Sequence, residues 1–214
     1  MPARPTRGAP FRLDLDALRR HFATAPLPEA SVYGDDGARE ENPELLPASV
    51  LVPIVERAGG LQLLLTQRAT HLKLHSGQVS FPGGRADEGD TGPEATALRE
   101  AQEEIGLDPA RVELLGRLPE YRTGTGYCIT PVVGVLNPPF ELRPDPNEVT
   151  EIFEVALARV LDPANHRRES MHWRGRERQF FVIPHERYRI WGATAGMLVN
   201  LSRYLAAGSE HGRL

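Results

Sequence analysis

The 214-residue chain contains a single cysteine, Cys128, so it cannot form an intrachain disulfide. It also lacks an apolar run near the roughly 18 residues that a membrane-spanning helix requires. Its first residues, MPARPTRGAP, include charge and proline but none of the apolar sequence that secretory signals carry. These absences give no indication of secretion or of a membrane partner, and they favour a cytoplasmic location.

The chain also has fewer basic than acidic residues: 25 Lys and Arg compared with 29 Asp and Glu, which gives a formal net charge of −4. Nucleic-acid binding without sequence preference usually needs a basic surface, so the composition argues against a nucleic-acid partner. Anionic small molecules stay possible, because a metal ion or a few local arginines can hold them. The length and a hydrophobic content of 40% are typical of a globular domain with a sizeable core.

Acidic charge is concentrated in the segment REAQEEIGL, residues 99–107. If this segment is helical, Glu100, Glu103 and Glu104 share one face, where each like-charged pair costs about 0.2–0.5 kcal/mol. A divalent cation would offset this cost, and oxygen-only ligands favour Mg²⁺ or Mn²⁺. The alternative is a solvated acidic helix face without a ligand, which is common in soluble proteins.

The residues before this segment predict how it is held. A short apolar strand over residues 78–81 leads into Pro82-Gly83-Gly84, where we expect a tight turn whose backbone can approach a ligand. Thr91 is expected to cap a helix over residues 93–105, with Glu94 as its capping-box partner. Gly106 should end that helix. The residues expected to face the core are Leu98, Ala101, Gln102 and Ile105.

Gly84 together with residues 99–107 resembles the Nudix box. The box reads Gly, five residues, Glu, seven residues, then Arg-Glu-apolar-x-Glu-Glu-x-Gly-apolar, and the second half matches at every fixed position. The first half differs, because Asp90 stands where the family usually has Glu and the loop before Arg99 is one residue longer. The resemblance implies an α/β fold, the Nudix-type α/β/α sandwich with a mixed β-sheet. It also implies hydrolysis of a pyrophosphate in nucleoside diphosphates linked to another group.

The stretch before the box, residues 63–84, resembles the extended signature of the coenzyme A pyrophosphatase branch. A longer box that begins with Asp is also usual in that branch, and Lys73 stands where Arg is usual. The substrate implied is coenzyme A, free, oxidised or acylated, cleaved to adenosine 3′,5′-bisphosphate and 4′-phosphopantetheine. Residues 130–134, 147–149 and 190–195 are similar to later parts of the branch. The matching positions before the box include Leu64, Leu65, Thr66, Arg68, Leu72, His75, Gly77, Val79 and Phe81.

The resemblance assigns roles within the box. Glu100, Glu103, Glu104 and the Gly84 carbonyl are implied as ligands of Mg²⁺ or Mn²⁺. Glu103 or Glu104 is a candidate for the catalytic base. Arg99 is expected to pair with a carboxylate of the helix and to orient it, as residues behind metal ligands commonly do.

Residues outside the box complete the predicted site. Arg68, Lys73 and His75 are the substrate-binding candidates, because basic groups there could meet the 3′-phosphate of coenzyme A. The alternative is that Arg68 and His75 pair with acidic residues of the loop. Glu148 and Glu151 are weaker candidates for the base, and charge balance at a helix start is the competing interpretation.

Two other functions are compatible with the sequence. One is a Nudix pyrophosphatase for another dinucleotide, such as ADP-ribose or NADH, which the upstream signature argues against. The other is a Nudix-fold binding module without catalysis, although such modules usually lose the glutamates that this chain keeps. The oligomeric state is open between a monomer and a homodimer.

The remaining sequence predicts an N-terminal extension with a short helix (1–40), a Nudix domain (41–207) and a C-terminal tail (208–214). Aromatic residues Trp173, Phe180 and Phe181 could stack on adenine, although aromatic residues in strands more often belong to the core. The expected elements are helices over 13–22, 149–161 and 193–205, a linker over 26–47, strands over 49–55, 61–66, 112–118 and 129–136, and a hairpin of 170–173 with 179–183.

Overall fold

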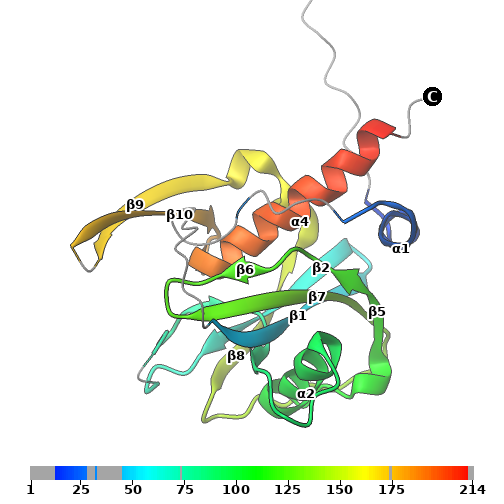
Figure 1. Cartoon of the computed structure of the whole chain (residues 1–214). Helices are drawn as coiled ribbons and strands as arrows, with labels where there is room; N and C mark the ends of the chain where they lie inside the picture. The colour runs from blue at the N-terminus through cyan, green and yellow to red at the C-terminus, as the bar shows by residue number, and fades with distance from the viewer. Residues whose placement is uncertain (1–12, 28–31, 33–44, 73, 174, 212–214) are drawn as a thin grey trace, which may run out of the picture.

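The computed structural model describes residues 13–27, 32, 45–72, 74–173 and 175–211. Figure 1 shows three layers, a mixed β-sheet with helix α2 (Pro93–Ile105) on one face and helix α4 (Gly192–His211) on the other. The predicted fold class, an α/β/α sandwich around a mixed sheet, is confirmed.

The central strand of the sheet is β1 (Leu46–Arg57), which runs parallel to β7 (Tyr127–Leu136) and antiparallel to β2 (Gly60–Arg68). These are longer versions of the strands predicted over 49–55, 61–66 and 129–136. The other strands all pair antiparallel with one of these three: β3 (Val79–Ser80), β4 (Gly83–Arg85), β5 (Val112–Arg117), β6 (Tyr121–Arg122) and β8 (Val149–Ala156).

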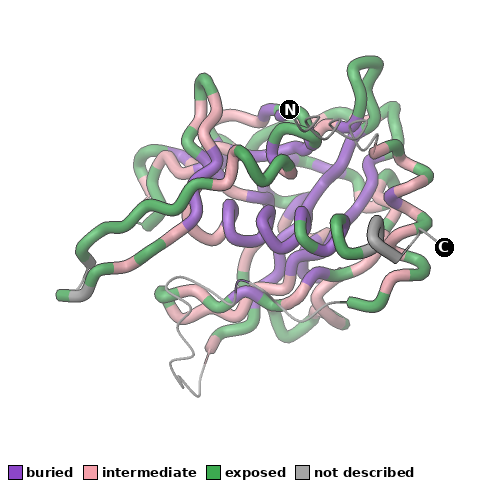
Figure 2. Tube along the Cα trace, turned by 90° about the horizontal axis from the view of Figure 1, so that it is seen from above, coloured by how far each residue is buried: buried purple, intermediate pink, exposed green. Residues whose placement is uncertain are grey.

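Strand β1 separates two hydrophobic cores. Val50, Val52 and Ile54 belong to the core beneath α4, whereas Leu51 and Val55 belong to the core beneath α2. Successive side chains of a strand point to opposite faces, so a strand covered on both faces is apolar at nearly every position. Figure 2 shows the buried residues gathered in the middle of the molecule.

The N-terminal helix α1 (Leu15–Thr24) lies against the domain. Leu18 is fully buried, and the ring of Phe22 meets the ring of Tyr204 in α4 edge to face at 5.1 Å. Arg19 forms an ion pair of 2.6 Å with Glu113 in β5. The helix predicted over 13–22 is therefore present, and it contributes a side chain to the main core.

The helix predicted over residues 149–161 is wrong. Residues 149–156 form β8, in which Phe153 pairs with Leu65 of β2, and only α3 (Leu157–Leu161) is helical. Phe153, Val155 and Leu157 are buried, and the residues between them are exposed. That period of two fits a strand better than the helical period of 3.6.

Two predicted irregular segments are also corrected. Gly83 and Gly84 form the short strand β4 beside β1, with Val50 opposite Gly83, where we expected a turn. The linker predicted over 26–47 falls mostly outside the described residues, and its last residues, Leu46 and Pro47, begin β1.

A second sheet covers part of the α4 side. It consists of β9 (Arg167–Trp173), β10 (Arg176–Pro184) and β11 (Arg189–Trp191), and the predicted hairpin is confirmed as β9–β10, which projects beyond the central sheet in Figure 1. The helix predicted over 193–205 is confirmed within α4.

Among the described helices, none is long and apolar enough to span a membrane. The described residues also include two short 3₁₀ turns, Pro109–Arg111 and Pro163–Asn165.

Candidate active site

Helix α2 spans the predicted residues and ends at Gly106, which has a left-handed φ of 66°. Its start differs from the prediction, because Gly92 occupies the N-cap without a side-chain cap and Glu94 instead pairs with Arg117 at 2.6 Å. Its buried face also differs: Gln102 is exposed, and the buried positions are Thr96, Ala97, Ala101, Glu104 and Ile105.

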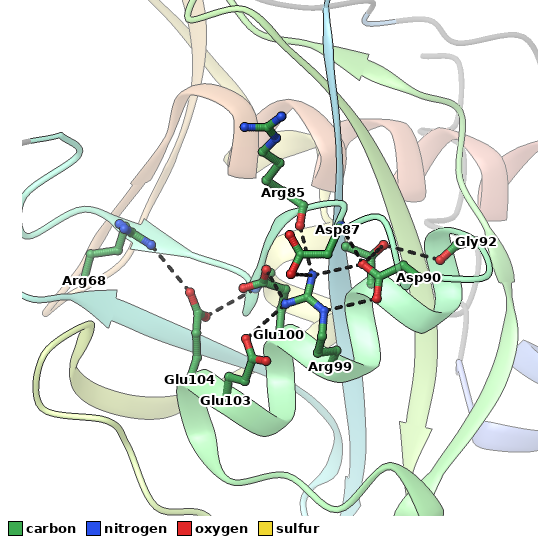
Figure 3. A network of polar contacts seen from close by, with 11 residues as sticks. Arg68, Arg85, Asp87, Asp90, Gly92, Arg99, Glu100, Glu103 and Glu104 are labelled. Atoms are coloured by element: carbon green, nitrogen blue, oxygen red, sulfur yellow. Dashed lines mark hydrogen bonds and ion pairs between the residues drawn. The ribbon is translucent and has the colours of Figure 1, made fainter.

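Glu104 is therefore a carboxylate that points into the protein. Its side chain is 3% exposed, accepts a hydrogen bond from the Gly83 N–H at 3.2 Å, and lies 3.6 Å from Nη1 of Arg68. Burial raises the pKa of Glu104 to about 8, the charges of Glu148 and Glu100 add to this rise, and Arg68 opposes it. Figure 3 shows the Glu104 carboxylate directed toward the Arg68 guanidinium.

Glu100 lies directly against β4, the glycine strand, which contains Gly83 and Gly84. A methyl group on Gly84 would come within 2.5 Å of the Glu100 carboxylate, and a methyl group on Gly83 would collide with the Ser49 carbonyl of β1. Burial raises the pKa of Glu100, and the adjacent Arg99 opposes this rise. The two glycines therefore let β4 fit between β1 and the acidic face of α2.

Arg99 connects the acidic loop to the helix, as Figure 3 shows. Its guanidinium donates to Asp90 through Nε at 3.1 Å and Nη2 at 3.0 Å, and through Nη1 to Glu100 at 2.9 Å and Glu103 at 3.0 Å. The expected pairing of Arg99 with helix carboxylates is present. Asp90, despite the longer loop, reaches the same arginine, and the sequence did not indicate this contact.

Glu148 also lies at the site, since its charge raises the pKa of both Glu100 and Glu104. Its backbone is held by a hydrogen bond from the Ala69 N–H to its carbonyl at 2.8 Å, beside Arg68. A strand, not a helix, follows at residue 149, so charge balance at a helix start does not account for Glu148.

Glu151, the other candidate outside the box, is engaged elsewhere. It pairs with Arg187 at 3.1 Å and accepts a hydrogen bond from the Tyr188 hydroxyl at 2.9 Å. Tyr188 packs on Phe153, which belongs to the core beneath α4. The contacts of Glu151 therefore lie on the face of the sheet opposite α2.

The substrate-binding candidates have different surroundings. Arg68 ends β2 beside Glu104, and its buried Nε has no hydrogen-bond partner among the described residues. His75 is exposed, has a positive φ of 56°, and shares a hydrogen bond of 3.0 Å with the side chain of Gln78. Lys73 lies outside the described residues. Of the three, Arg68 is the residue that the structure brings to the acidic cluster.

The donor set suits a hard divalent ion. In the part of the chain that the structure describes, no three Asp, Glu, His or Cys side chains form a ready ligand set. Glu103 is largely exposed and bonded to Arg99, whereas Glu100 and Glu104 lie beside β4 and offer only oxygen ligands. Mg²⁺ commonly takes one or two carboxylates and keeps waters or substrate phosphates, so these two residues fit such an ion.

Fold and site together define an α/β/α domain with an acidic helix suited to divalent-ion chemistry on phosphates. The NUDIX domain family model matches residues 45–174. The chain belongs to the Nudix hydrolase family.

Relatives with known names support this membership. The protein called "Uncharacterized Nudix hydrolase NudL" in Escherichia coli K12 is 43% identical over 155 residues, which cover 72% of this chain and 80% of that protein. Its namesake in Escherichia coli O6:H1 matches to the same extent. The crystal structure of the Nudix hydrolase RenU from M. smegmatis covers 79% of this chain and 88% of its own, with 20% identity and a TM-score of 0.50, and shows a similar fold.

Proposed function

We propose that the protein hydrolyses the pyrophosphate of coenzyme A in the presence of Mg²⁺ or Mn²⁺, giving adenosine 3′,5′-bisphosphate and 4′-phosphopantetheine. One observation carries the proposal: the segment that resembles the coenzyme A branch places Arg68 3.6 Å from Glu104 of the Nudix box. The segment that resembles the branch and the box thus lie side by side, which supports one shared site. A basic group beside metal-binding carboxylates is well placed to receive a phosphate.

The roles follow from the contacts. Glu100 and Glu104 would hold the ion, with the Gly84 carbonyl and Glu103 as further ligands. When bound, the ion withdraws charge from the phosphates and makes a bound water more acidic. Arg99 fixes the directions of Glu100 and Glu103 through its two hydrogen bonds. Arg68 binds a substrate phosphate, and the resemblance to the coenzyme A branch extends substrate binding to Lys73 and His75.

The catalytic base is one of three carboxylates that differ in their exposure to solvent. Glu103 is exposed and held by Arg99, Glu104 is buried, and Glu148 is exposed and close enough to raise the pKa of Glu104. An exposed carboxylate can receive a proton from an attacking water and release it to solvent, which favours Glu103 or Glu148 as the base and Glu104 as a ligand. Separate Gln substitutions distinguish them, because loss of a ligand weakens Mn²⁺ binding and loss of the base does not.

The test compares hydrolysis of coenzyme A, ADP-ribose and NADH by the purified protein in ¹⁸O-labelled water with Mg²⁺. We expect coenzyme A to be cleaved fastest, and the labelled product identifies the phosphorus attacked. Faster cleavage of ADP-ribose or NADH would assign the protein to another substrate. Cleavage of none of them, with Mn²⁺ also tried, would favour a binding module.

A substitution tests the site itself. Glu104→Gln should lower turnover by orders of magnitude while the circular dichroism spectrum is unchanged, because the amide keeps the shape but loses the charge. Glu141→Gln is the control, since Glu141 is exposed and paired with Arg143. Normal turnover of Glu104→Gln with Mg²⁺ present would refute the metal assignment.

A further inference from the structure

The sheet formed by β9, β10 and β11 is rich in arginine. Residues 167–189 contain seven Arg and three Glu, a net charge of +4 in a chain whose net charge is −4. The family match ends at residue 174, so β10 and β11 lie beyond it. This local positive charge is complementary to a phosphate-bearing ligand.

One face of this sheet carries an aromatic pair that does not belong to either core. The rings of Phe180 and Trp191 lie 5.3 Å apart at 61°, and the Arg189 guanidinium lies 5.6 Å from the Trp191 ring. Both rings are partly exposed. Their neighbours Phe181 and Ile190 point the other way, into the core beneath α4.

The aromatic pair lies near β3, the strand that leads into β4. Strand β11 lies against β3, and the Thr194 hydroxyl, three residues after Trp191, donates to the Val79 carbonyl at 3.0 Å. From Val79 the chain passes through Phe81 and Pro82 directly into β4. A ligand whose phosphates lie at Gly84 could therefore extend along β3 toward Trp191.

We propose that Phe180 and Trp191 form a stacking site for the purine base of a nucleotide, with Arg189, which also pairs with Glu169, attracting its phosphates. The inference rests on the proposed function and identifies where that reaction's nucleotide is held. Partly exposed aromatic rings stack on any base, and adjacent arginines add charge for the phosphates. A nucleotide combines the planar ring and the negative charge that this face complements.

Tryptophan fluorescence tests the site without catalysis. The chain has two tryptophans, so Trp173→Phe leaves Trp191 as the reporter. With a chelator present, adenosine 3′,5′-bisphosphate should quench Trp191 emission saturably, and ribose 5-phosphate, which has no base, should not. In this background Phe180→Leu should raise the Kd for the bisphosphate about tenfold, the order expected for loss of one stacking partner.

Phe140→Leu is the matched control. Phe140 carries a similar contact at another place in the fold, with the Arg57 guanidinium 5.4 Å from its ring, and its substitution should leave the Kd unchanged. Equal quenching by ribose 5-phosphate, or an unchanged Kd in Phe180→Leu, would overturn the inference. So would a Trp191 signal that changes with protein concentration alone, because a second copy would then cover this face.

The stacking site and the hydrolase activity can be refuted independently of each other. If coenzyme A is cleaved but Phe180→Leu binds the bisphosphate as its parent does, the stacking site is refuted and the hydrolase stands. If the bisphosphate quenches Trp191 through Phe180 but no pyrophosphate substrate is cleaved, the stacking site stands and the hydrolase is refuted.

Discussion

Two hydrogen bonds join Arg99 to Asp90: Nε donates to Oδ1 at 3.1 Å, and Nη2 donates to Oδ2 at 3.0 Å. These bonds and the N–H of Asp87 hold the pKa of the Asp90 carboxyl well below its usual range. The Thr96 hydroxyl donates to the same carboxylate at 2.9 Å. Asp90 thus fixes Arg99, and Arg99 in turn fixes the two carboxylates that it contacts on α2.

Asp90→Asn should lower turnover about 10- to 100-fold, the range found when a group that orients a metal ligand is lost. The amide removes the charge and one acceptor, so Arg99 and Glu100 lose their fixed positions. Steady-state turnover and Mn²⁺ affinity measure the effect. Asp87→Asn is the control, because the Asp87 carboxylate is mostly exposed and 3.9 Å from Arg99. An equal loss in both variants would contradict the positioning role.

Alanine substitutions of the two glycines in β4 should have different effects. A methyl group on Gly84 meets the Glu100 carboxylate, a flexible side-chain end, whereas one on Gly83 meets the backbone of β1 at Ser49 and Val50. Gly84→Ala should therefore fold but lose activity. Gly83→Ala should lose about 1–3 kcal/mol of unfolding free energy. Thermal melts and turnover of both variants check this. A stable, fully active Gly84→Ala would show that the Glu100 position does not matter.

Helix α2 and its end at Gly106 could be predicted from the sequence, because proline, good helix formers and a terminal glycine all act locally. Its start could not, because Gly92 takes the N-cap and Glu94 pairs with Arg117, 23 residues further along the chain. Local signals therefore determined the helix, and tertiary contacts determined its cap.

Strand β8 and the burial of Glu104 depend on tertiary structure. Residues 149–161 contain apolar spacings compatible with either a helix or a strand, and pairing with β2 selects the strand. The heptad-like spacing of the box glutamates shows that they share a face but not that Glu104 points beneath β4. Which carboxylate is buried follows from where the glycine strand lies, and a single sequence does not specify that.

Leu18→Ala tests whether α1 belongs to the same folding unit as the Nudix domain. Leu18 is fully buried in the main core, so its truncation should cost about 2–5 kcal/mol of unfolding free energy in urea, with one cooperative transition. Leu27→Ala should cost almost nothing, because Leu27 is 53% exposed. A small effect of Leu18→Ala would support the division at residue 40 expected from the sequence.

The metal-free protein should lose stability as the pH rises, because of Glu104. Its pKa is about 8 in the folded protein against an ordinary 4.5, so between these values the folded state keeps a proton that the unfolded state has released. This contribution is fully present below the lower value and is lost as the pH rises through about 8, by at most about 1.4 kcal/mol per pH unit. Relative to wild type, Glu104→Gln should therefore become more stable toward pH 8, measured by urea unfolding with a chelator.

Saturating Mg²⁺ should reverse this trend for wild type, because an ion that binds only the folded state with ionised Glu104 stabilises that state by mass action. Glu104→Gln should respond much less to Mg²⁺ at pH 8. Glu141→Gln serves as the matched control, since Glu141 is exposed and paired with Arg143, and its substitution leaves the buried carboxylate in place. Parallel pH curves for wild type and Glu104→Gln without metal would mean that the folded structure does not keep Glu104 protonated, and the burial of its carboxylate would then lack the predicted electrostatic cost.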